Sequence, residues 1–305
     1  MTPRRTSYYE ATARARIAAL VDDASFAEFC GPAERRTSPH LAALGAPVSF
    51  DDGIAVGAAR LGGRPVLIAA QEGRFNGGAV GEVHGAKLRG LLDRARAERP
   101  AAVLLLVDSG GVRLHEANAG LIAISEVMRA LLAARAAGVP VIALVGGSCG
   151  AFGGMGIVTR LCSAVLMSEE GRLSLSGPEV IETVKGVEEF DSRDRALVWR
   201  VTGGKLRRAL GEADRLVEDD VAAFRAAALD WLAAWPGAPA PDAELAALRG
   251  AHAALAERAT HFADTRDGAE VWRARGFAEP ARVPMLAAAE FERALAEAGA
   301  HGSAT

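Results

Sequence analysis

Two glycine-rich runs in the sequence could do chemistry, because each follows a short apolar run and precedes a helical pattern. Residues 108–113 follow the apolar run 101–107, and residues 146–154 follow the run 140–145. Such runs present unobstructed backbone N–H groups at the start of a helix, where these donors are partly positive and can stabilise an oxyanion. Neither run contains a convincing acid–base pair. The residues therefore favour a reaction that mainly needs an enolate to be stabilised, and acyl-thioester chemistry is the natural candidate.

The pair His115-Glu116 stands at the start of the long helical pattern behind the first run. The negative charge of Glu116 is predicted to stabilise that end of the helix through the helix dipole. His115 is a candidate for proton transfer. We favour the structural role for Glu116 and keep His115 as the sharper functional hypothesis.

The second run also fits the pattern G-x-S-x-G of a nucleophile elbow, with Ser148 as the serine. Asp264 and His301 follow in the chain order of a hydrolase triad. The last seventy or so residues are alanine-rich and helical in pattern, so they do not supply the strand-end loops that would carry this acid and this histidine. We therefore interpret Ser148 and Cys149 as small residues that permit a close turn. Neither run matches the dinucleotide-binding or P-loop patterns.

Composition excludes several other classes of protein. A net charge of −3 argues against a nucleic-acid binder, which normally has a basic surplus. Three cysteines without C-x-x-C spacing and six histidines without H-x-x-x-H spacing predict neither a zinc site nor a disulfide framework. The longest apolar run, 101–107, is far too short to cross a bilayer, and the polar start is unlike a secretory signal. We expect a soluble, cytoplasmic protein that binds no membrane.

The elements that must position the glycine runs have α/β character. Residues 54–60 and 65–70 are predicted to be strands joined by a two-residue hairpin at Gly62-Gly63. A glycine-rich loop and a helix to about Arg99 follow. The order strand, glycine turn, helix then occurs twice, which predicts strands that feed helices. The helices of these two units are expected over 116–137 and from Met155 onward.

The two ends of the chain are predicted to be helical. The spacing of Ser7 and Glu10 resembles a capping box in front of a helix that runs to about Leu20. A strand is expected at 162–167 and a strand stub at 173–175, and the chain after Asp191 has a helical pattern. The proline- and glycine-rich segment 235–241 is the clearest linker signal. We therefore divide the chain into a core, 1–235, that includes the N-terminal helix, and a helical C-terminal extension, 236–305.

A succession of segments resembles the carboxyltransferase core of acyl-CoA carboxylases. The similarity extends from about Thr12 to Asp219. The segments are 13–17 and 20–28 of the leading helix, 52–57 and 62–66, the glycine loop and helix 77–87, the S-G-G-A-R-x-x-E-like signature 108–116, and the G-P-x-V-I-E-like segment 175–182. Within this superfamily, residues 71–78 and 108–114 most resemble the β subunits of biotin-independent malonate decarboxylases. The chain lacks the four-cysteine zinc module of bacterial acetyl-CoA carboxylase β subunits, and it has only one such core.

This resemblance implies a crotonase-like α/β fold, in which ββα units spiral into a core. It implies a γ subunit with a related core and an active site shared between the two subunits. The substrate would be a malonyl thioester on a small acyl-carrier subunit that bears a phosphoribosyl-dephospho-CoA arm, and the products would be the acetyl thioester and carbon dioxide. An acyl-carrier-protein transferase subunit would complete the complex. No cofactor would be bound directly, and neither biotin nor a metal would be needed.

The resemblance also suggests roles for individual residues. Gly110 and Gly111 match the family's first oxyanion glycines, whose N–H groups would hold the thioester oxygen as it becomes an enolate. Gly150 and Ala151 fall in the second glycine turn, although the working second turn could belong to the partner subunit. Gly77 and Gly78 would contact the thioester or the CoA-like arm. Arg113 lies in the signature and is predicted to brace the loop by ion pairing.

Two other functions remain open from the sequence. One is a carboxyltransferase subunit of a biotin-dependent carboxylase or decarboxylase, which would deliver the carboxyl group to biotin on another chain. The other is a scaffolding subunit, in which the glycine turns are only structural and the partner does the chemistry.

Overall fold

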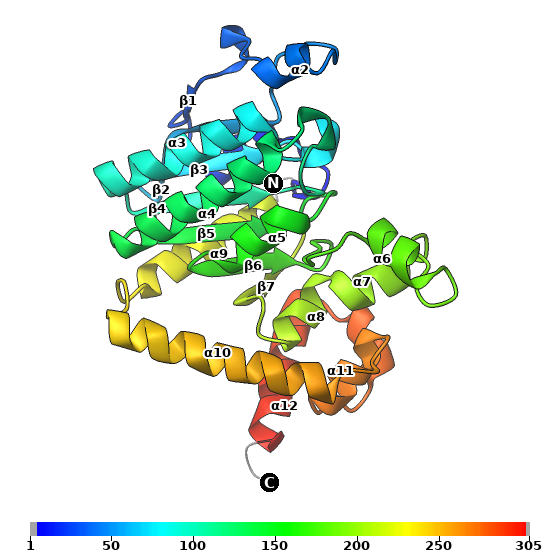
Figure 1. Ribbon diagram of the computed structural model, residues 1–305. Coiled ribbons are helices and arrows are strands. Elements are labelled where there is room, and N and C mark those ends of the chain that lie inside the picture. The colour runs from blue at the N-terminus through cyan, green and yellow to red at the C-terminus, as the bar shows by residue number, and fades with distance from the viewer. Residues whose placement is uncertain (1–4, 303–305) are drawn as a thin grey trace.

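A seven-stranded sheet forms the centre of the computed structural model, which describes residues 5–302 (Figure 1). Its spatial order follows the chain: β1 Ala27–Phe29, β2 Ile54–Leu61, β3 Arg64–Gln71, β4 Ala102–Val107, β5 Val141–Val145, β6 Ala164–Ser168 and β7 Arg215–Val217. The first three strands are antiparallel, and β3 to β7 are parallel. Beyond the ends of the parallel strands, single bridges join Val80 to Val112 and Ser109 to Ala151. Each turn of the chain thus adds one main strand and one short bridged segment, as a spiral of ββα units requires.

The hairpin between β2 and β3 forms at the predicted glycines. Gly62 and Gly63 have φ values of 58° and 76°, and two consecutive positive φ angles are typical of the type I′ turn that suits the twist of a hairpin. The carboxylate of Asp22 accepts both turn N–H groups, at 2.9 and 2.7 Å. The hairpin prediction is confirmed.

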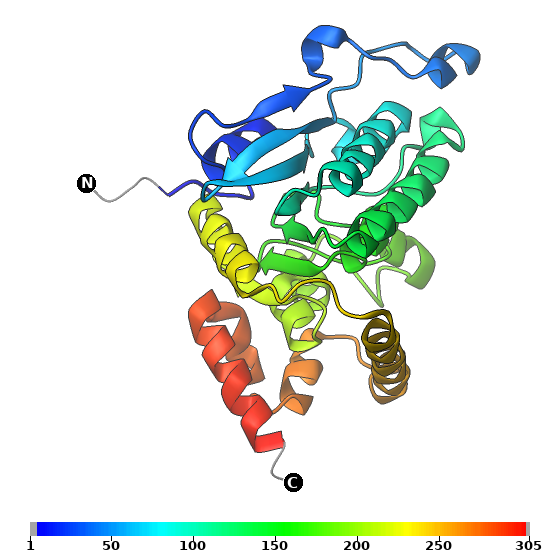
Figure 2. The same ribbon diagram turned by 90° about the vertical axis from the view of Figure 1, so that its left-hand side faces the viewer.

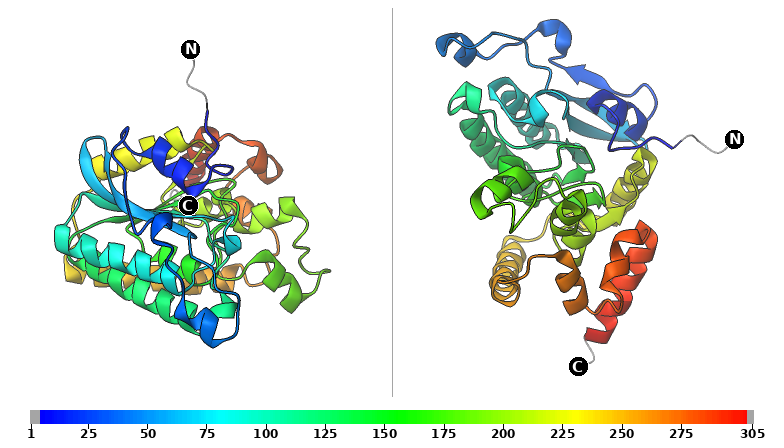
Figure 3. Two further views of the ribbon diagram at one scale, coloured as in Figure 1. Left: turned by 90° about the horizontal axis from the view of Figure 1, so that it is seen from above. Right: turned by 90° about the vertical axis from the view of Figure 1, so that its right-hand side faces the viewer.

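Helices cover both faces of the sheet (Figure 3). On one face lie α3 Glu82–Glu98, α4 Ala119–Ala136 and α5 Gly153–Arg160, and on the other lie α1 Ala13–Leu20 and α9 Val221–Ala234. Leu88, Val127 and Met155 belong to the first apolar cluster, whereas Ile17 and Phe224 belong to the second. The buried strands between these layers alternate their side chains into both clusters, so β4 and β5 are apolar throughout.

The C-terminal helices pack on one end of this core (Figure 2). The C-terminal helices are α10 Pro241–His261, α11 Gly268–Ala274 and α12 Ala288–Gly302. The other α-helices, which come earlier in the chain, are α2 Pro39–Ala43, α6 Pro178–Lys185, α7 Arg195–Thr202 and α8 Gly204–Ala209. Trp272 and Phe291 join Leu206 and Leu216 in a third apolar cluster, which links the extension to α8 and β7. Within α10 no side chain is buried. The proposed division after residue 235 falls between α9 and α10 and stays a prediction.

Two sequence-based expectations about elements are wrong. The first helix begins at Ala13, with the Thr12 hydroxyl accepting from the Ala15 N–H, and not near Ser7. The Ser7 hydroxyl does accept the Glu10 N–H, but this pair closes a separate turn. Strand β7 lies in the part of the chain that was expected to be helical. A strand of three residues is too short to show a periodic pattern, and it forms because β6 offers it an edge.

Among residues 5–302, the helices are all too short or too polar to span a bilayer.

Candidate active site at two adjoining glycine turns

The two predicted glycine turns lie side by side where β4 and β5 end. The Ser109 N–H donates to the Gly150 carbonyl at 2.7 Å, and the Phe152 N–H donates back to the Ser109 carbonyl at 3.0 Å. Further along, a Cβ added at Gly153 would lie 3.3 Å from the Cα of Gly111. The structure therefore brings the first turn against the N-terminal end of α5.

The four predicted oxyanion donors differ in what they already bind. The Gly110 N–H donates to the Gly77 carbonyl at 2.9 Å, the Gly150 N–H to the Gly147 carbonyl at 3.1 Å and the Ala151 N–H to the Arg172 carbonyl at 2.7 Å. The Gly111 N–H donates only to a side chain, the Ser109 hydroxyl, at 3.2 Å. A hydroxyl can rotate away, whereas the carbonyl partners belong to the packed backbone. Gly111 is thus the most available of these four donors.

The start of α5 supplies further donors that the sequence analysis missed. The Gly153 N–H donates to the Leu175 carbonyl at 2.8 Å. Within the described residues, the N–H groups of Gly154 and Met155 have no acceptor. The first N–H groups of a helix point along its axis and carry its positive dipole end. The signal in the sequence was the pair Gly153-Gly154, at the point where the glycine run becomes a helix.

Gly77 and Gly78 lie in the loop that packs against the first turn. Gly77 is exposed, has a φ of 62° and offers its carbonyl to Gly110. Gly78 is buried, and a Cβ there would overlap the carbonyl oxygen of Asp108. Gly78 is therefore required for close backbone packing, and contact of either glycine with a CoA-like arm stays a prediction.

Arg113 braces the other side of the first turn, as predicted. Its guanidinium is buried and pairs with Asp51 and with Glu116, the latter at 3.1 Å, and its Nε donates to the Ala79 carbonyl at 2.8 Å. Burial opposes ionisation of Asp51, but the hydrogen bonds and charge of Arg113 outweigh it and lower the pKa of Asp51. These contacts tie the signature to two loops without reaching the N–H donors.

The prediction for Glu116 is wrong about which helix it serves. Helix α4 begins only at Ala119, and the buried Glu116 carboxylate accepts the N–H of Glu82, the first residue of α3, at 2.7 Å. A carboxylate at a helix N-terminus is favourable because of the dipole, and the helix it stabilises here is α3. This pairing joins residues far apart in the sequence, so local spacing cannot reveal it.

The contacts of His115 are with Glu116 and the lining of a cavity, and none is with the N–H donors of the turns. Its side chain is 52% exposed, and its Nε2 lies 4.0 Å from the Glu116 carboxylate. It lines a cavity of about 280 Å³ together with Phe50, Phe75 and Asn76. A role in proton transfer stays a prediction.

Among the residues that the structure describes, Ser148 has no contacts of the kind that a hydrolase triad requires. Its carbonyl accepts from the Arg172 guanidinium, and the next N–H, that of Cys149, donates to the Asp108 carboxylate at 2.6 Å. The side chain of His301 lies outside the described residues. The contacts agree with a close turn built from small residues.

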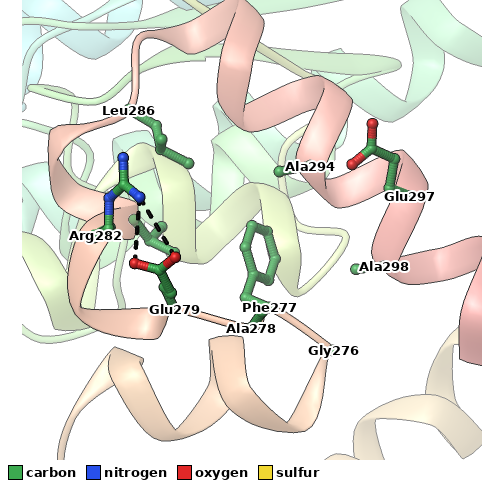
Figure 4. A pocket seen from close by; sticks show the side chains of 10 residues that line it. Gly276, Phe277, Ala278, Glu279, Arg282, Leu286, Ala294, Glu297 and Ala298 are labelled. Carbon is green, nitrogen blue, oxygen red and sulfur yellow. Dashed lines mark hydrogen bonds and ion pairs between the residues drawn. The ribbon is translucent and has the colours of Figure 1, made fainter.

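Another cavity, of about 450 Å³, lies among the C-terminal helices and shares no residue with the glycine turns (Figure 4). Phe277 and Leu286 contribute apolar surface, and an ion pair between Glu279 and Arg282, at 3.3 Å, lies at one side. No predicted site residue lines it. In the described part of the chain, no cluster of three histidine, cysteine or acidic side chains is arranged to hold a metal.

The carboxyl transferase domain family matches residues 8–256, which include both glycine turns. The chain belongs to this family. Its members act on carboxyl groups, so the chain is placed among enzymes of that kind.

Two relatives match the chain over different shares of their own lengths. Over 233 residues, the chain is 45% identical to the malonyl-S-ACP:biotin-protein carboxyltransferase MADC of Malonomonas rubra, a match that covers 72% of this chain and 73% of that protein. It is 33% identical over 183 residues to a putative propionyl-CoA carboxylase beta chain of Bacillus subtilis, covering 59% of this chain. This match covers 34% of the Bacillus subtilis protein, so the chain corresponds to about one third of that longer protein.

Solved structures of malonate decarboxylases have the same fold. A chain of a Pseudomonas malonate decarboxylase hetero-tetramer in complex with malonate is 40% identical, with a TM-score of 0.75 over 88% of this chain and 97% of that one. A chain of the MdcD-MdcE hetero-dimer is 39% identical, with a TM-score of 0.62 over 77% of this chain and 90% of that one. These matches confirm the predicted crotonase-like α/β class and the resemblance to malonate decarboxylases.

Proposed function

We propose that this chain is the β subunit of a malonate decarboxylase. Together with a γ subunit it converts a malonyl thioester on an acyl-carrier subunit into the acetyl thioester and carbon dioxide, as a carboxy-lyase. The observation that carries the proposal is the meeting of the Gly111 turn with the N-terminus of α5, where the Gly154 N–H has no acceptor among the described residues. The similarity to malonate decarboxylase chains over nearly their whole length supports it.

The proposed chemistry needs little beyond these donors. As the bond to the carboxylate carbon breaks, carbon dioxide leaves and the electron pair moves through the α-carbon to the thioester oxygen, which becomes an enolate. The N–H groups of Gly111 and Gly154 stabilise that oxygen where its charge develops, and fixed donors of this kind need no reorganisation. A proton then adds to the α-carbon and gives the acetyl thioester. Gly110 would contribute only if its bond to the Gly77 carbonyl opened.

A γ partner is proposed because the surroundings of the turns are apolar and uncovered. Leu114 and Leu175, which flank the turns, are 86% and 67% exposed, and Val180 and Val184 on α6 are 54% and 76% exposed. Large exposed apolar patches mark interaction sites. The similarity to a chain of the MdcD-MdcE hetero-dimer supports a partner of this kind. We further propose an acyl-carrier subunit with a phosphoribosyl-dephospho-CoA arm and its transferase as members of the complex.

The second candidate is a carboxyltransferase that passes the carboxyl group to biotin on another chain. The identity to a malonyl-S-ACP:biotin-protein carboxyltransferase favours it specifically. In both functions the chain stabilises the same enolate, so the turns alone do not separate them.

The deciding experiment measures carbon dioxide release from a malonyl thioester by the reconstituted complex, with and without excess avidin, and with a chelator. Release that neither reagent affects supports the decarboxylase. Inhibition by avidin favours the carboxyltransferase, and inhibition by the chelator reveals a metal requirement.

A matched experiment tests the partner. The isolated chain should be inactive and should self-associate in the analytical ultracentrifuge, whereas addition of the γ subunit should restore activity. A stable, active monomer would contradict the proposed partner.

A further inference from the structure

One buried carboxylate, that of Asp108, touches both glycine turns. Asp108 begins the first turn, and its Oδ1 accepts the Cys149 N–H of the second turn at 2.6 Å. Its Oδ2 accepts from Arg16 Nη1 on α1 at 2.8 Å, and its own N–H donates to Gln71 Oε1 at 3.1 Å. The side chains of Arg16 and Asp108 are only 2% and 3% exposed. Helix α1 and both turns thus converge on a single side chain, and strand β3 holds the backbone of the same residue.

The backbone around this carboxylate leaves no room for other side chains. A Cβ added at Gly147 would overlap the Asp108 carboxyl carbon, and one added at Gly73 would lie 2.7 Å from Asp108 Oδ2. Gly73 and Gly147 are therefore needed because the Asp108 carboxylate packs against both of them. Their N–H groups need not contact any ligand for glycine to be required.

The guanidinium that pairs with Asp108 is itself held in place. Arg16 Nε donates to the Tyr8 carbonyl at 2.7 Å, and the guanidinium lies over the Tyr8 ring, 4.7 Å from its centroid. Burial raises the pKa of Asp108, and the charge of Arg16 offsets part of that effect. A buried ion pair is weak evidence for stability, because the loss of solvation can exceed the attraction between the charges. The arrangement therefore calls for another reason than stability.

We propose that Arg16 and Asp108 are positioning residues that set the spacing between the two glycine turns, and with it the distance between the N–H donors of Gly111 and Gly154. This inference rests on the proposed function, because it assigns those donors to one oxyanion. Misplacing a reacting group by about 1 Å can lower a rate about 100-fold. Neither Arg16 nor Asp108 touches the substrate in this arrangement, so their loss should lower kcat while KM changes little.

Asp108→Asn is the first test variant, because the amide oxygen can still accept the Cys149 N–H while the charge facing Arg16 is lost. We expect kcat for carbon dioxide release by the assembled complex to fall about 100-fold. The double variant Arg16→Met with Asp108→Asn removes both buried charges. It should regain thermal stability and still have the low kcat, which a purely structural role for the pair would not produce.

Gly147→Ala tests the same geometry without a charge change, since its Cβ would displace the carboxylate. Gly57→Ala is the matched control: its Cβ would overlap the Ala27 carbonyl oxygen on the edge strand, away from the turns. At equal loss of thermal stability, Gly147→Ala should lose far more kcat than Gly57→Ala. Equal losses of kcat, or wild-type kcat in a folded Asp108→Asn complex, would overturn the proposal.

Amide hydrogen exchange separates failure of this inference from failure of the proposed function. In the wild-type complex the N–H groups of residues 149–152 should exchange slowly, and Asp108→Asn and Gly147→Ala should both accelerate that exchange, whatever the reaction. A wild-type complex that releases no carbon dioxide refutes the proposed function. Unchanged exchange in both variants refutes the positioning role, even if the complex is active.

Discussion

Alanine substitutions at Gly110 and Gly111 distinguish a donor that is available from one that is already used. Gly111 has a φ of 133°, which L-residues rarely adopt, but the nearest atom to an added Cβ is the Phe152 carbonyl oxygen at 4.0 Å. The Gly111→Ala variant therefore meets backbone strain and no steric overlap, and strain of this kind costs about 1–3 kcal/mol. At Gly110 an added Cβ would make an ordinary 3.4 Å contact with the Gly77 carbonyl oxygen. Gly110→Ala should change the free energy of unfolding by less than about 0.5 kcal/mol.

The effects on rate should differ more than the effects on stability. Relief of the strain at Gly111 rotates the peptide and turns its N–H away from the proposed oxyanion. Loss of one such donor lowers kcat about 10²–10³-fold, which is about 2.7–4 kcal/mol of transition-state stabilisation. The Gly110 N–H is bonded to the Gly77 carbonyl, so Gly110→Ala should keep kcat within a few-fold of wild type.

The assay is carbon dioxide release at saturating malonyl thioester by the assembled complex, with urea unfolding of the isolated chain beside it. Full kcat in a folded Gly111→Ala complex would refute the assignment of the Gly111 N–H and favour a scaffolding role. An equal loss of kcat at Gly110 would mean that its bond to Gly77 opens during turnover.

Three further predictions concern buried ionisable groups. Burial lowers the pKa of His84 to about 3. Between that pH and about 6.5, the unfolded chain binds a proton that the native chain does not. The free energy of unfolding therefore falls as the pH falls, by up to about 1.4 kcal/mol per pH unit. His84→Gln should flatten urea-derived stability against pH in that window, and an unchanged slope would contradict the assignment. Burial raises the pKa of Glu169 to about 7, so the native chain holds a proton between about pH 4.5 and 7 that the unfolded chain has lost, and stability falls as pH rises. Glu169→Gln should therefore be more stable than wild type at pH 8, by no more than about 3 kcal/mol, and indistinguishable from it near pH 4.5. Glu116→Ala should destabilise the chain by about 3–5 kcal/mol, measured by urea unfolding, because it leaves buried Arg113 with one partner fewer and the Glu82 N–H without its acceptor; a loss below about 1 kcal/mol would show that the contact is replaced.

Structural elements that depend on neighbouring residues in the chain could be predicted from the sequence. The hairpin at Gly62-Gly63, the buried strands β4 and β5 and the turns behind them all follow from local rules for turns and apolar runs. The ββα spiral was implied by resemblance and not by periodicity. Strand β7, which depends on pairing with β6, could not be predicted in this way.

Contacts between distant segments could not be predicted. Arg16 and Asp108 are separated by 92 residues, and Glu116 stabilises a helix that begins 34 residues earlier. An arginine in an alanine-rich helix and an aspartate after a buried strand have no local pattern that pairs them. The two residues meet only because the fold brings α1 against the sheet, where Asp108 contacts both Arg16 and the second turn.

The glycines of this site have two different roles. The space available to a Cβ at each position shows which role a glycine has. At Gly78 and Gly147 a Cβ would overlap the backbone or side chain of Asp108, so glycine is required there whether or not a ligand binds. At Gly111 the space is open, and the residue is held in a conformation with φ positive while its N–H has only a hydroxyl partner. Glycine adopts such a φ without a steric penalty, and the open space leaves room for a ligand beside the backbone. The case for chemistry at these turns thus rests on Gly111 and the adjoining start of α5, more than on the number of glycines in the signature.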